Sequence, residues 1–225
     1  MKNRTKDILI AICIILAYLF SGIIEVIPFI LLGINTANLN KLFIMIYSIT
    51  YEVLFIFMII LAYKDEIKNN FKVLIKNVND VFFKYIPYWV LMVFMMYAAN
   101  ALIFVFVKDI AKNEEQVRTI IDNYPIYAFI LSVILAPIME ELIFRKCVRK
   151  IFSNRIIYII VSGLFFGMMH VLTDISNVTD LLFLIPYSIP GFIFAYIYTD
   201  SKNIFSSICI HMMHNCILVM LQILI

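Results

Sequence analysis

The stretch Pro125–Arg145 reads PIYAFILSVILAPIMEELIFR. It is long enough to cross a bilayer as a helix, which takes about 20 predominantly apolar residues. Near its end it carries two adjacent carboxylates, Glu140 and Glu141. Ionisable side chains inside a membrane are costly, so each is a functional candidate by default. This stretch therefore predicts a membrane-spanning helix that also carries chemistry.

The composition of the whole chain agrees with a membrane protein. Of 225 residues, 64% are hydrophobic and 15% are charged, against about 45–50% and about 25% in soluble domains. These values exclude a disordered chain, a nucleic-acid-binding module and a secreted disulfide scaffold. They also argue against a water-soluble globule, because a chain of this length has too little interior for so many apolar side chains. The composition predicts an all-α polytopic membrane protein.

Seven apolar segments are long enough, or nearly long enough, to span a bilayer. They are Ile8–Leu32, Leu42–Tyr63, Tyr85–Val107, Pro125–Phe144, Ile156–Val171, Leu181–Tyr198 and Ile204–Ile225. The sixth contains Pro186, Pro190 and Gly191 and is expected to be kinked or broken, since proline interrupts helical hydrogen bonding. The chain is therefore expected to have about seven transmembrane helices, or eight if the sixth segment is split.

The distribution of basic residues predicts the orientation. If the N-terminus is cytoplasmic, fourteen of the eighteen Lys and Arg residues fall in inner segments, as the positive-inside rule requires. The apolar run from Ile8 resembles a signal peptide, but it continues to Leu32 without a clear cleavage site and is expected to remain as the first span. Because the chain is rich in Ile, Lys and Asn, we expect a bacterial plasma-membrane protein.

The inner segment near 64–84 has its own pattern. Apolar residues recur at helical spacing, and lysines line another face: Ile67, Phe71, Leu74, Val78 and Val81 against Lys68, Lys72 and Lys76. This pattern predicts an amphipathic helix on the inner leaflet with its apolar side towards the lipid, most simply an interfacial anchor, with lipid sensing or substrate docking as the alternative. The chain is thus divided into N-terminal transmembrane helices with this basic helix (1–124) and a catalytic core (125–225).

The two carboxylates differ in their local partners. Glu141 and Arg145 are four residues apart with the acid first, the favourable order for an ion pair on a helix. The residue four positions after Glu140 is Phe144, so Glu140 has no such cation. A carboxylate without a neighbouring cation is suited to act as a general base. Pro137 is expected to kink this helix, because it cannot donate to Val133.

Helix arithmetic brings further polar residues to the level of Glu140. Glu140 and His170 each lie fifteen residues from Arg155, so an antiparallel hairpin would place both about 22 Å along their helices. Gly163 and Gly167 would allow the two helices of this hairpin to approach closely. On the last apolar segment, His211 is expected at a similar depth.

A second polar residue, Asn215, lies one helical turn after His211 on the same face. Such a set has two chemical interpretations. A glutamate beside imidazoles can deprotonate a water while His and Asn stabilise an oxyanion. Alternatively, Glu140, His170 and His211 could ligate a divalent metal such as zinc.

His214 is expected to be a bystander. The four cysteines form no CxxC pair and are interpreted as packing residues.

Three short motifs in this order resemble those of the Abi/CPBP family of intramembrane proteases, which includes the type II CAAX prenyl endopeptidases. Glu140–Arg145 is similar to the family's EExxxR motif, Phe166–His170 to its FxxxH motif, and His211–Asn215 to its HxxxN motif. The resemblance covers roughly 126–221.

The resemblance implies an intramembrane endopeptidase that cuts membrane-embedded or membrane-proximal peptides. By position, Glu140 resembles the catalytic glutamate and His170 its water-holding partner, while His211 and Asn215 resemble the oxyanion stabilisers. Glu141 and Arg145 resemble a supporting pair, together with Phe166 of the second motif.

Two other functions stay open at this stage. One is a non-catalytic scaffold or bacteriocin-immunity protein of the same fold. The other is a small transporter or proton relay that uses Glu25, Glu52 and Glu140. The expected partners are the lipid bilayer and a peptide substrate. The Ile-, Lys- and Asn-rich composition suggests an AT-rich bacterial genome, so a prenylated substrate is less expected.

Overall fold

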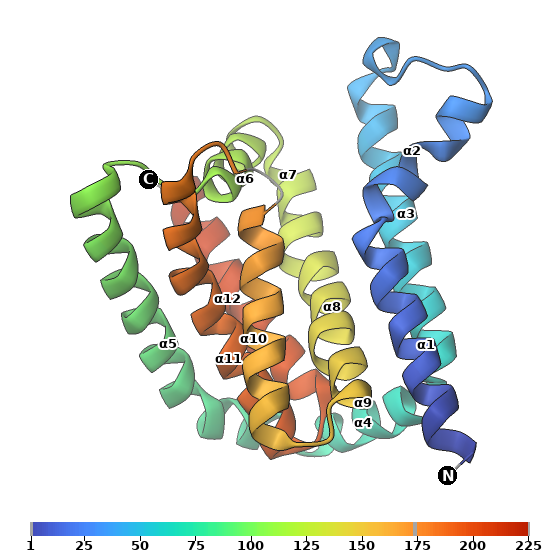
Figure 1. The fold of residues 1–225 in the computed structure, drawn as a ribbon, viewed down its shortest axis with the longest axis vertical. Helices are drawn as coiled ribbons and strands as arrows, with labels where there is room; N and C mark the ends of the chain where they lie inside the picture. Colours follow the sequence, from blue (N-terminus) through green and yellow to red (C-terminus); the bar gives the residue numbers. More distant parts are fainter. Residues whose placement is uncertain (1, 173–174, 225) are drawn as a thin grey trace.

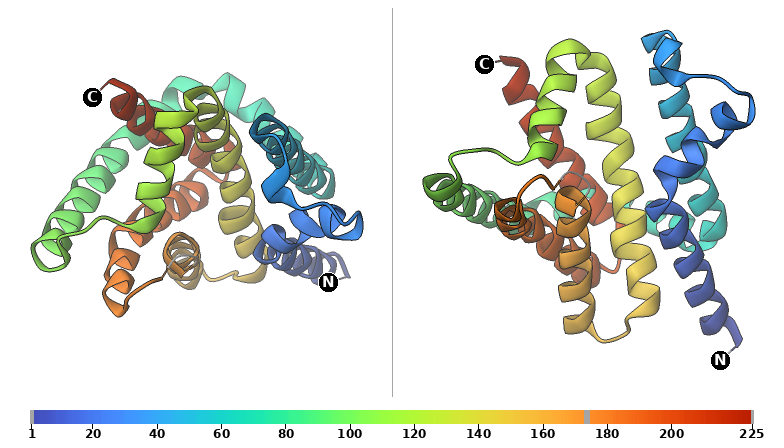
Figure 2. Two further views of the ribbon diagram at one scale, coloured as in Figure 1. Left: turned by 90° about the horizontal axis from the view of Figure 1, so that it is seen from above. Right: turned by 45° about the horizontal axis from the view of Figure 1, so that its top comes forward.

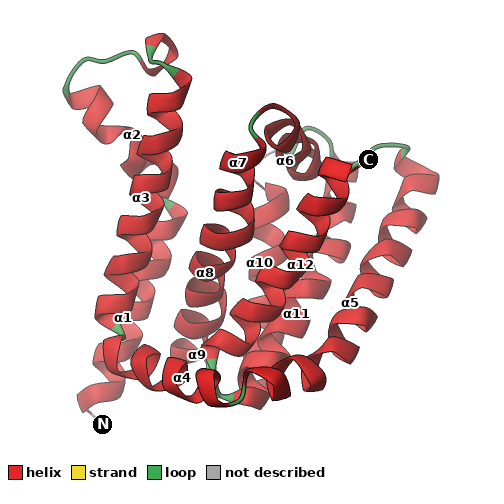
Figure 3. Cartoon of the chain, turned by 180° about the vertical axis from the view of Figure 1, so that it is seen from behind, coloured by secondary structure: helices red, strands yellow, loops and turns green. Residues whose placement is uncertain are grey.

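The computed structural model describes residues 2–172 and 175–224, and within these ranges the chain forms helices and no β-strand (Figure 3). The longer helices stand side by side, and the two termini lie at opposite ends of the bundle (Figure 1). The all-α polytopic membrane fold predicted from composition is confirmed.

The N-terminal part of the chain forms a helical unit beside the rest of the bundle (Figure 2). It consists of α1 (Lys2–Leu19), α2 (Ser21–Leu31), the short 3₁₀ helix η1 (Thr36–Asn38) and α3 (Lys41–Ala62). The axis bends by 63° between α1 and α2, and the Tyr51 hydroxyl of α3 donates to the Ser21 carbonyl at this bend (3.3 Å). The edge of the Tyr18 ring meets Phe144, with ring centroids 5.5 Å apart, so α1 packs against the helix that carries the two carboxylates.

The remaining elements follow in chain order. They are α4 (Lys64–Lys76), α5 (Val78–Val107), α6 (Lys112–Asn123), α7 (Pro125–Ala128), the π-helical η2 (Phe129–Leu135), α8 (Ala136–Glu140), the π-helical η3 (Glu141–Cys147), α9 (Val148–Ile151), α10 (Arg155–Val171), the 3₁₀ helix η5 (Val178–Phe183), α11 (Leu184–Ser201) and α12 (Ile204–Leu224). Elements α7 to α9 follow one another without a break and form one long helix from 125 to 151.

The helices account for each of the seven predicted apolar segments. Among the described residues, five helices are long and apolar enough to cross a membrane, and the bent pair α1–α2 is a sixth candidate; α10 is apolar but shorter. The sixth predicted segment forms one helix, α11, with Pro190 inside it. The expected break there is therefore not observed. Large side chains such as Phe83 and Phe106 are 82% and 81% exposed, as expected of surfaces that face lipid.

The glycines of α10 have a different partner from the predicted one. A methyl group on Gly191 of α11 would lie 2.6 Å from the Gly163 carbonyl oxygen, and one on Gly167 would lie 2.3 Å from Ser188 Oγ. Gly163 and Gly167 therefore permit close packing of α10 on α11, not on the helix of Glu140 as expected. The turn before α10 is as predicted: Asn154 caps the helix by accepting from the amide of Ile156 (2.9 Å).

The predicted amphipathic helix is α4, but its apolar side faces protein. Ile67 and Leu74 are buried, and the ring of Phe71 lies 5.4 Å from that of Phe205 at the start of α12. The helix lies across the end of the bundle at which the chain begins (Figure 1). The expectation that the whole apolar face enters lipid is therefore wrong, because the ends of the spanning helices already cover much of it.

Candidate active site

The two carboxylates of the EExxxR motif occupy adjoining helical turns and have different environments. Glu140 ends α8, and Glu141 begins the π-helical turn η3. The side chain of Glu141 is fully buried, whereas that of Glu140 is 14% exposed. Inserted π turns are frequent at functional sites because they redirect side chains without ending the helix. Of the two carboxylates, only that of Glu140 is therefore accessible to a reactant.

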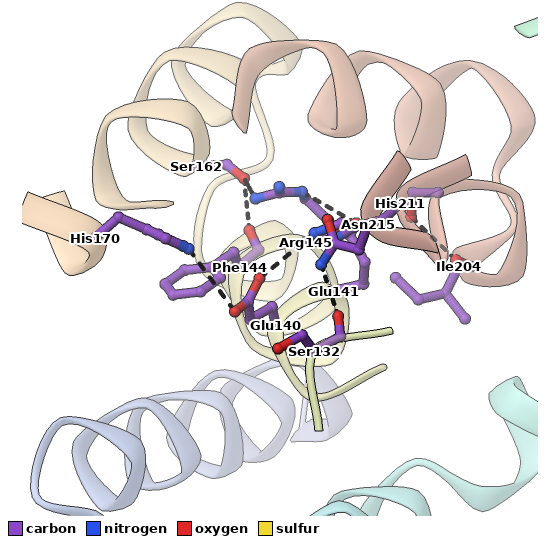
Figure 4. A network of polar contacts seen from close by, with 11 residues as sticks. Ser132, Glu140, Glu141, Phe144, Arg145, Ser162, His170, Ile204, His211 and Asn215 are labelled. Carbon is purple, nitrogen blue, oxygen red and sulfur yellow. Dashed lines mark hydrogen bonds and ion pairs between the residues drawn. The ribbon is translucent and has the colours of Figure 1, made fainter. Parts of the chain in front are cut away.

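The Glu141 carboxylate contacts two side chains, those of Arg145 and His211. Its Oε2 lies 3.1 Å from Arg145 Nε, and its Oε1 accepts from His211 Nδ1 at 3.0 Å. The ion pair predicted from the i, i+4 spacing is thus present, with both side chains fully buried. The contact between Glu141 and His211 connects the helix of the two carboxylates to α12 (Figure 4).

Arg145 is enclosed by aromatic rings and by α10. Its guanidinium lies 4.8 Å from the centre of the Phe166 ring and 5.7 Å from that of Phe194. Its Nη1 donates to Ser162 Oγ (3.2 Å), which in turn donates to the Phe144 carbonyl (2.6 Å). These contacts explain how a buried cation is tolerated, since charge, hydrogen bonds and ring faces all compensate its desolvation.

His170 is oriented by its own helix and by α11. Its Nδ1 lies 2.9 Å from the carbonyl of Phe166, one turn earlier, and this contact requires Nδ1 to be the protonated nitrogen. The imidazole lies between two rings, with centroids 4.4 Å from Phe166 and 5.1 Å from Tyr187. Its Nε2 is then free of a proton and points to Glu140, 3.9 Å from Oε1.

His211 reaches Glu140 from α12. Its ring stacks on Phe194, with centroids 4.5 Å apart. Because Nδ1 donates to Glu141, Nε2 is directed to Glu140 Oε2 at 3.7 Å. Both distances to Glu140 exceed those of a direct hydrogen bond. Glu140 is thus flanked by two imidazole nitrogens, each at the distance expected for a small polar molecule held between the groups.

Asn215 joins the same set through the backbone. Its Nδ2 donates to the Ser132 carbonyl (2.8 Å). In the π-helical turn η2 the amide of Ala136 bonds to Leu131, so the next residue, Pro137, would be the partner of Ser132 but has no N–H. The proline therefore leaves a carbonyl unpaired, and the Asn215 side chain pairs with it.

The structure brings together Glu140, His170 and His211, with Glu141 and Arg145 around them (Figure 4). The ring of Phe166 lies against Arg145 and His170. His214 points elsewhere: its Nδ1 accepts from Trp89 Nε1 (3.3 Å), in agreement with its interpretation as a bystander. Within the described part of the chain, no group of three or more His, Cys, Asp or Glu side chains is arranged to hold a metal ion. The zinc site that the residue types allow, with Glu140, His170 and His211 as candidate ligands, stays a prediction.

Motif analysis missed three residues that position the site. Tyr187 and Phe194 of α11 stack on the two histidines, and Ser162 of α10 links Arg145 to Phe144. Tyr187 and Phe194 are seven residues apart, two helical turns on one face. Their spacing in the sixth apolar segment, which matches none of the three motifs, was the signal from which these residues could have been predicted.

These observations define a class of protein: a helical membrane protein with a partly buried Glu–His–His–Asn set among its helices. Residues 122–217 match the family model described as type II CAAX prenyl endopeptidase Rce1-like. This segment is similar to that family, which confirms the resemblance noted in its three motifs.

Curated relatives agree with this assignment. The chain is 32% identical over 126 residues to a Staphylococcus aureus protein named "Membrane-embedded CAAX protease MroQ", which covers 52% of this chain and 47% of that one. It is 30% identical over 115 residues to a Bacillus subtilis protein named "Putative membrane peptidase YdiL", and the aligned region covers 50% of this chain and 43% of that one. The matches thus span less than half the length of these relatives. No solved structure gives a significant match.

Proposed function

We propose that this chain is an intramembrane endopeptidase that hydrolyses peptide bonds of membrane-embedded or membrane-proximal substrates. The observation that carries the proposal is the position of Glu140, with His170 Nε2 and His211 Nε2 at 3.9 and 3.7 Å from its two oxygens. The match of residues 122–217 to the type II CAAX prenyl endopeptidase Rce1-like family supports the same conclusion.

The contacts of His170 favour Glu140 as the general base. Because His170 Nδ1 faces a carbonyl, its Nε2 accepts rather than donates. Two acceptors 3.9 Å apart cannot bond to each other, but they can hold the two protons of one water molecule. Glu140 takes one proton from that water, and the resulting hydroxide attacks the carbonyl carbon of the substrate.

The negative charge that then develops on the carbonyl oxygen needs donors. Asn215 uses one N–H of its amide on Ser132, which fixes the orientation of the other. His211 can donate to this oxygen through Nε2 when that nitrogen carries a proton, while Nδ1 stays bonded to Glu141. The carbon–nitrogen bond breaks as the amine leaving group takes the proton from Glu140, which regenerates the carboxylate.

We further propose that the N-terminus is cytoplasmic in a bacterial plasma membrane and that the site is reached from that side. The charge asymmetry of the sequence supports this orientation. A cysteine at position 154, in the turn before α10, should react with membrane-impermeant reagents only from the cytoplasmic face. Labelling only from outside the cell would reverse the topology.

The central experiment compares membrane peptides in cells that produce the wild type, Glu140→Gln or Glu25→Gln. Wild type and Glu25→Gln should generate the same new peptide ends, because Glu25 of α2 makes no side-chain contact with the site in the described structure. Glu140→Gln should reduce cleavage by about 10²–10⁴-fold while it leaves the thermal unfolding midpoint unchanged. Full cleavage by Glu140→Gln would overturn the general-base role. Absence of cleavage by the wild type would favour the non-catalytic scaffold.

A further inference from the structure

The helix α4 contacts two of the helical segments that contribute to the site, although it contributes no residue to it. Towards the helix of Glu140, the Glu66 carboxylate accepts from Lys146 Nζ of η3 (2.8 Å) and from Lys150 Nζ of α9. Lys146 lies five residues after Glu141 on the same helical stretch. Glu66 therefore fixes α4 to the segment that carries the two carboxylates.

Towards α12, the contact is a helix cap supplied from another helix. The Oδ1 of Asn70 accepts from the amide of Ile204, the first residue of α12, and the Asn70 carbonyl accepts from Asn203 Nδ2, both at 2.9 Å. The first amides of a helix have no partner within it, so this cap stabilises the start of α12. His211 lies seven residues further along the same helix.

The opposite face of α4 is basic and exposed. Lys64, Lys68, Lys72 and Lys76 follow one another at intervals of four residues and form a lysine stripe. None of these four lysines forms an ion pair with any residue in the described ranges. Beside the stripe, Phe71 and Ile75 are 50% and 62% exposed.

Exposed apolar side chains flanked by lysines are typical of a helix at the depth of lipid headgroups. The apolar groups enter the outer part of the hydrocarbon layer, and the ammonium groups reach the phosphates. The acids of α4 do not neutralise this face, because Glu66 is bound to Lys146 and Lys150 and only Asp65 remains.

We propose that α4 is an anionic-lipid-binding brace: phosphates of acidic phospholipids bind the lysine stripe, and the seated helix holds η3 and α12 together through Glu66 and Asn70. Acidic lipid then favours the arrangement in which His211 faces Glu140, because only the seated helix presents the whole stripe to the headgroups at once. Each lysine near an acidic surface contributes about fivefold to membrane partitioning.

The test uses the Ile204 amide as a reporter. The full chain is placed in nanodiscs of phosphatidylcholine alone or with a quarter phosphatidylglycerol, and hydrogen–deuterium exchange is followed over 203–207. Phosphatidylglycerol should slow exchange at Ile204 in the wild type by about fivefold or more. High salt should remove the difference. This readout does not depend on proteolysis, so it can fail independently of the proposed function.

The control variant matches the charge change. Lys68→Gln with Lys72→Gln should abolish the effect of phosphatidylglycerol, whereas Lys41→Gln with Lys108→Gln, at the other end of the bundle, should preserve it. Equal loss in both double variants, or a lipid effect that survives in the first, would overturn the proposal.

Asn70 tests the connection to α12 separately. Asn70→Ala should make the Ile204 amide exchange rapidly in both lipids, while Asn70→Asp, which keeps an acceptor oxygen, should retain protection. Slow exchange in Asn70→Ala would refute the role of this cap in transmitting the position of α4.

Discussion

The side-chain amide of Asn215 donates a 2.8 Å hydrogen bond to the backbone carbonyl of Ser132. That carbonyl lacks its helical partner because Pro137 has no N–H. The proline and the asparagine come from different motif regions and from helices far apart in the sequence. Together they fix the orientation of the Asn215 side-chain amide through the Ser132 carbonyl.

This relationship predicts an unusual rescue. Asn215→Ala should lower the free energy of unfolding by about 1–3 kcal/mol, because the Ser132 carbonyl is left without a donor, and it should lower cleavage as well. Adding Pro137→Ala supplies a backbone N–H at the position that faces this carbonyl. The double variant should recover thermal stability in detergent but not cleavage. If stability and cleavage return together, Asn215 has only a structural role.

The buried Glu141–Arg145 pair predicts a strong coupling. Removing one partner of a buried ion pair costs about 3–5 kcal/mol, because the other charge is stranded. Arg145→Gln and Glu141→Gln should each be strongly destabilising, whereas the variant with both changes should be more stable than either. A double-mutant cycle on thermal unfolding measures this coupling. Strictly additive losses would show that the 3.1 Å contact contributes no energy.

The contact of α10 and α11 predicts opposite effects for two glycine substitutions. A methyl group at Gly191 would lie 2.6 Å from the Gly163 carbonyl oxygen, so Gly191→Ala should destabilise the protein by about 1–3 kcal/mol or more. Gly22→Ala is the matched control, since its methyl group would meet no atom within 4 Å. In helix α2 the control should be neutral or stabilising by up to about 1 kcal/mol. Similar unfolding midpoints for the two variants would contradict the close packing.

Glu66 predicts an acid-sensitive contact outside the membrane. Partial burial acts to raise the pKa of Glu66, but hydrogen bonds and charge from Lys146 and Lys150 prevail and lower it below the ordinary value of 4.5. A carboxyl whose folded pKa is lowered stabilises the fold above its unfolded pKa and loses that contribution as pH falls through the folded value. Unfolding midpoints of the wild type should therefore decline below about pH 4.5.

The decline below that pH should be smaller in Glu66→Gln. Asp65→Asn, which removes a neighbouring carboxylate that forms no ion pair in the described structure, should keep the full decline. An identical acid profile in Glu66→Gln and the wild type would show that these lysine contacts do not form in the membrane.

Much of the fold followed from local pattern. The apolar segments appeared as helices because a spanning segment must satisfy its own backbone hydrogen bonds. The Glu141–Arg145 pair was predictable because i, i+4 neighbours face each other on a helix. The equal depth of Glu140 and His170 followed from the rise per residue and the position of the turn before α10.

The predictions were wrong where they depended on which segment, or which medium, covers a given helix face. Gly163 and Gly167 indicated close helix packing, but periodicity does not say which neighbour packs there, and α11 occupies that position. The apolar face of α4 likewise indicated burial without saying whether lipid or protein covers it. Both questions concern contacts between segments that are distant in the chain.

The sequence by itself determined the class of the protein, its apolar segments and the residues of the site, because composition, helical spacing and short motifs depend on near neighbours along the chain. Only the tertiary structure decided that Glu141 binds His211, that Tyr187 and Phe194 stack on the histidines, and that Asn215 pairs with the carbonyl freed by Pro137. Hydrogen bonds and ring contacts act over a few ångströms, so they depend on how the helices rotate and approach. That packing is set by the whole bundle, and the spacing of residues along one helix does not specify its partner.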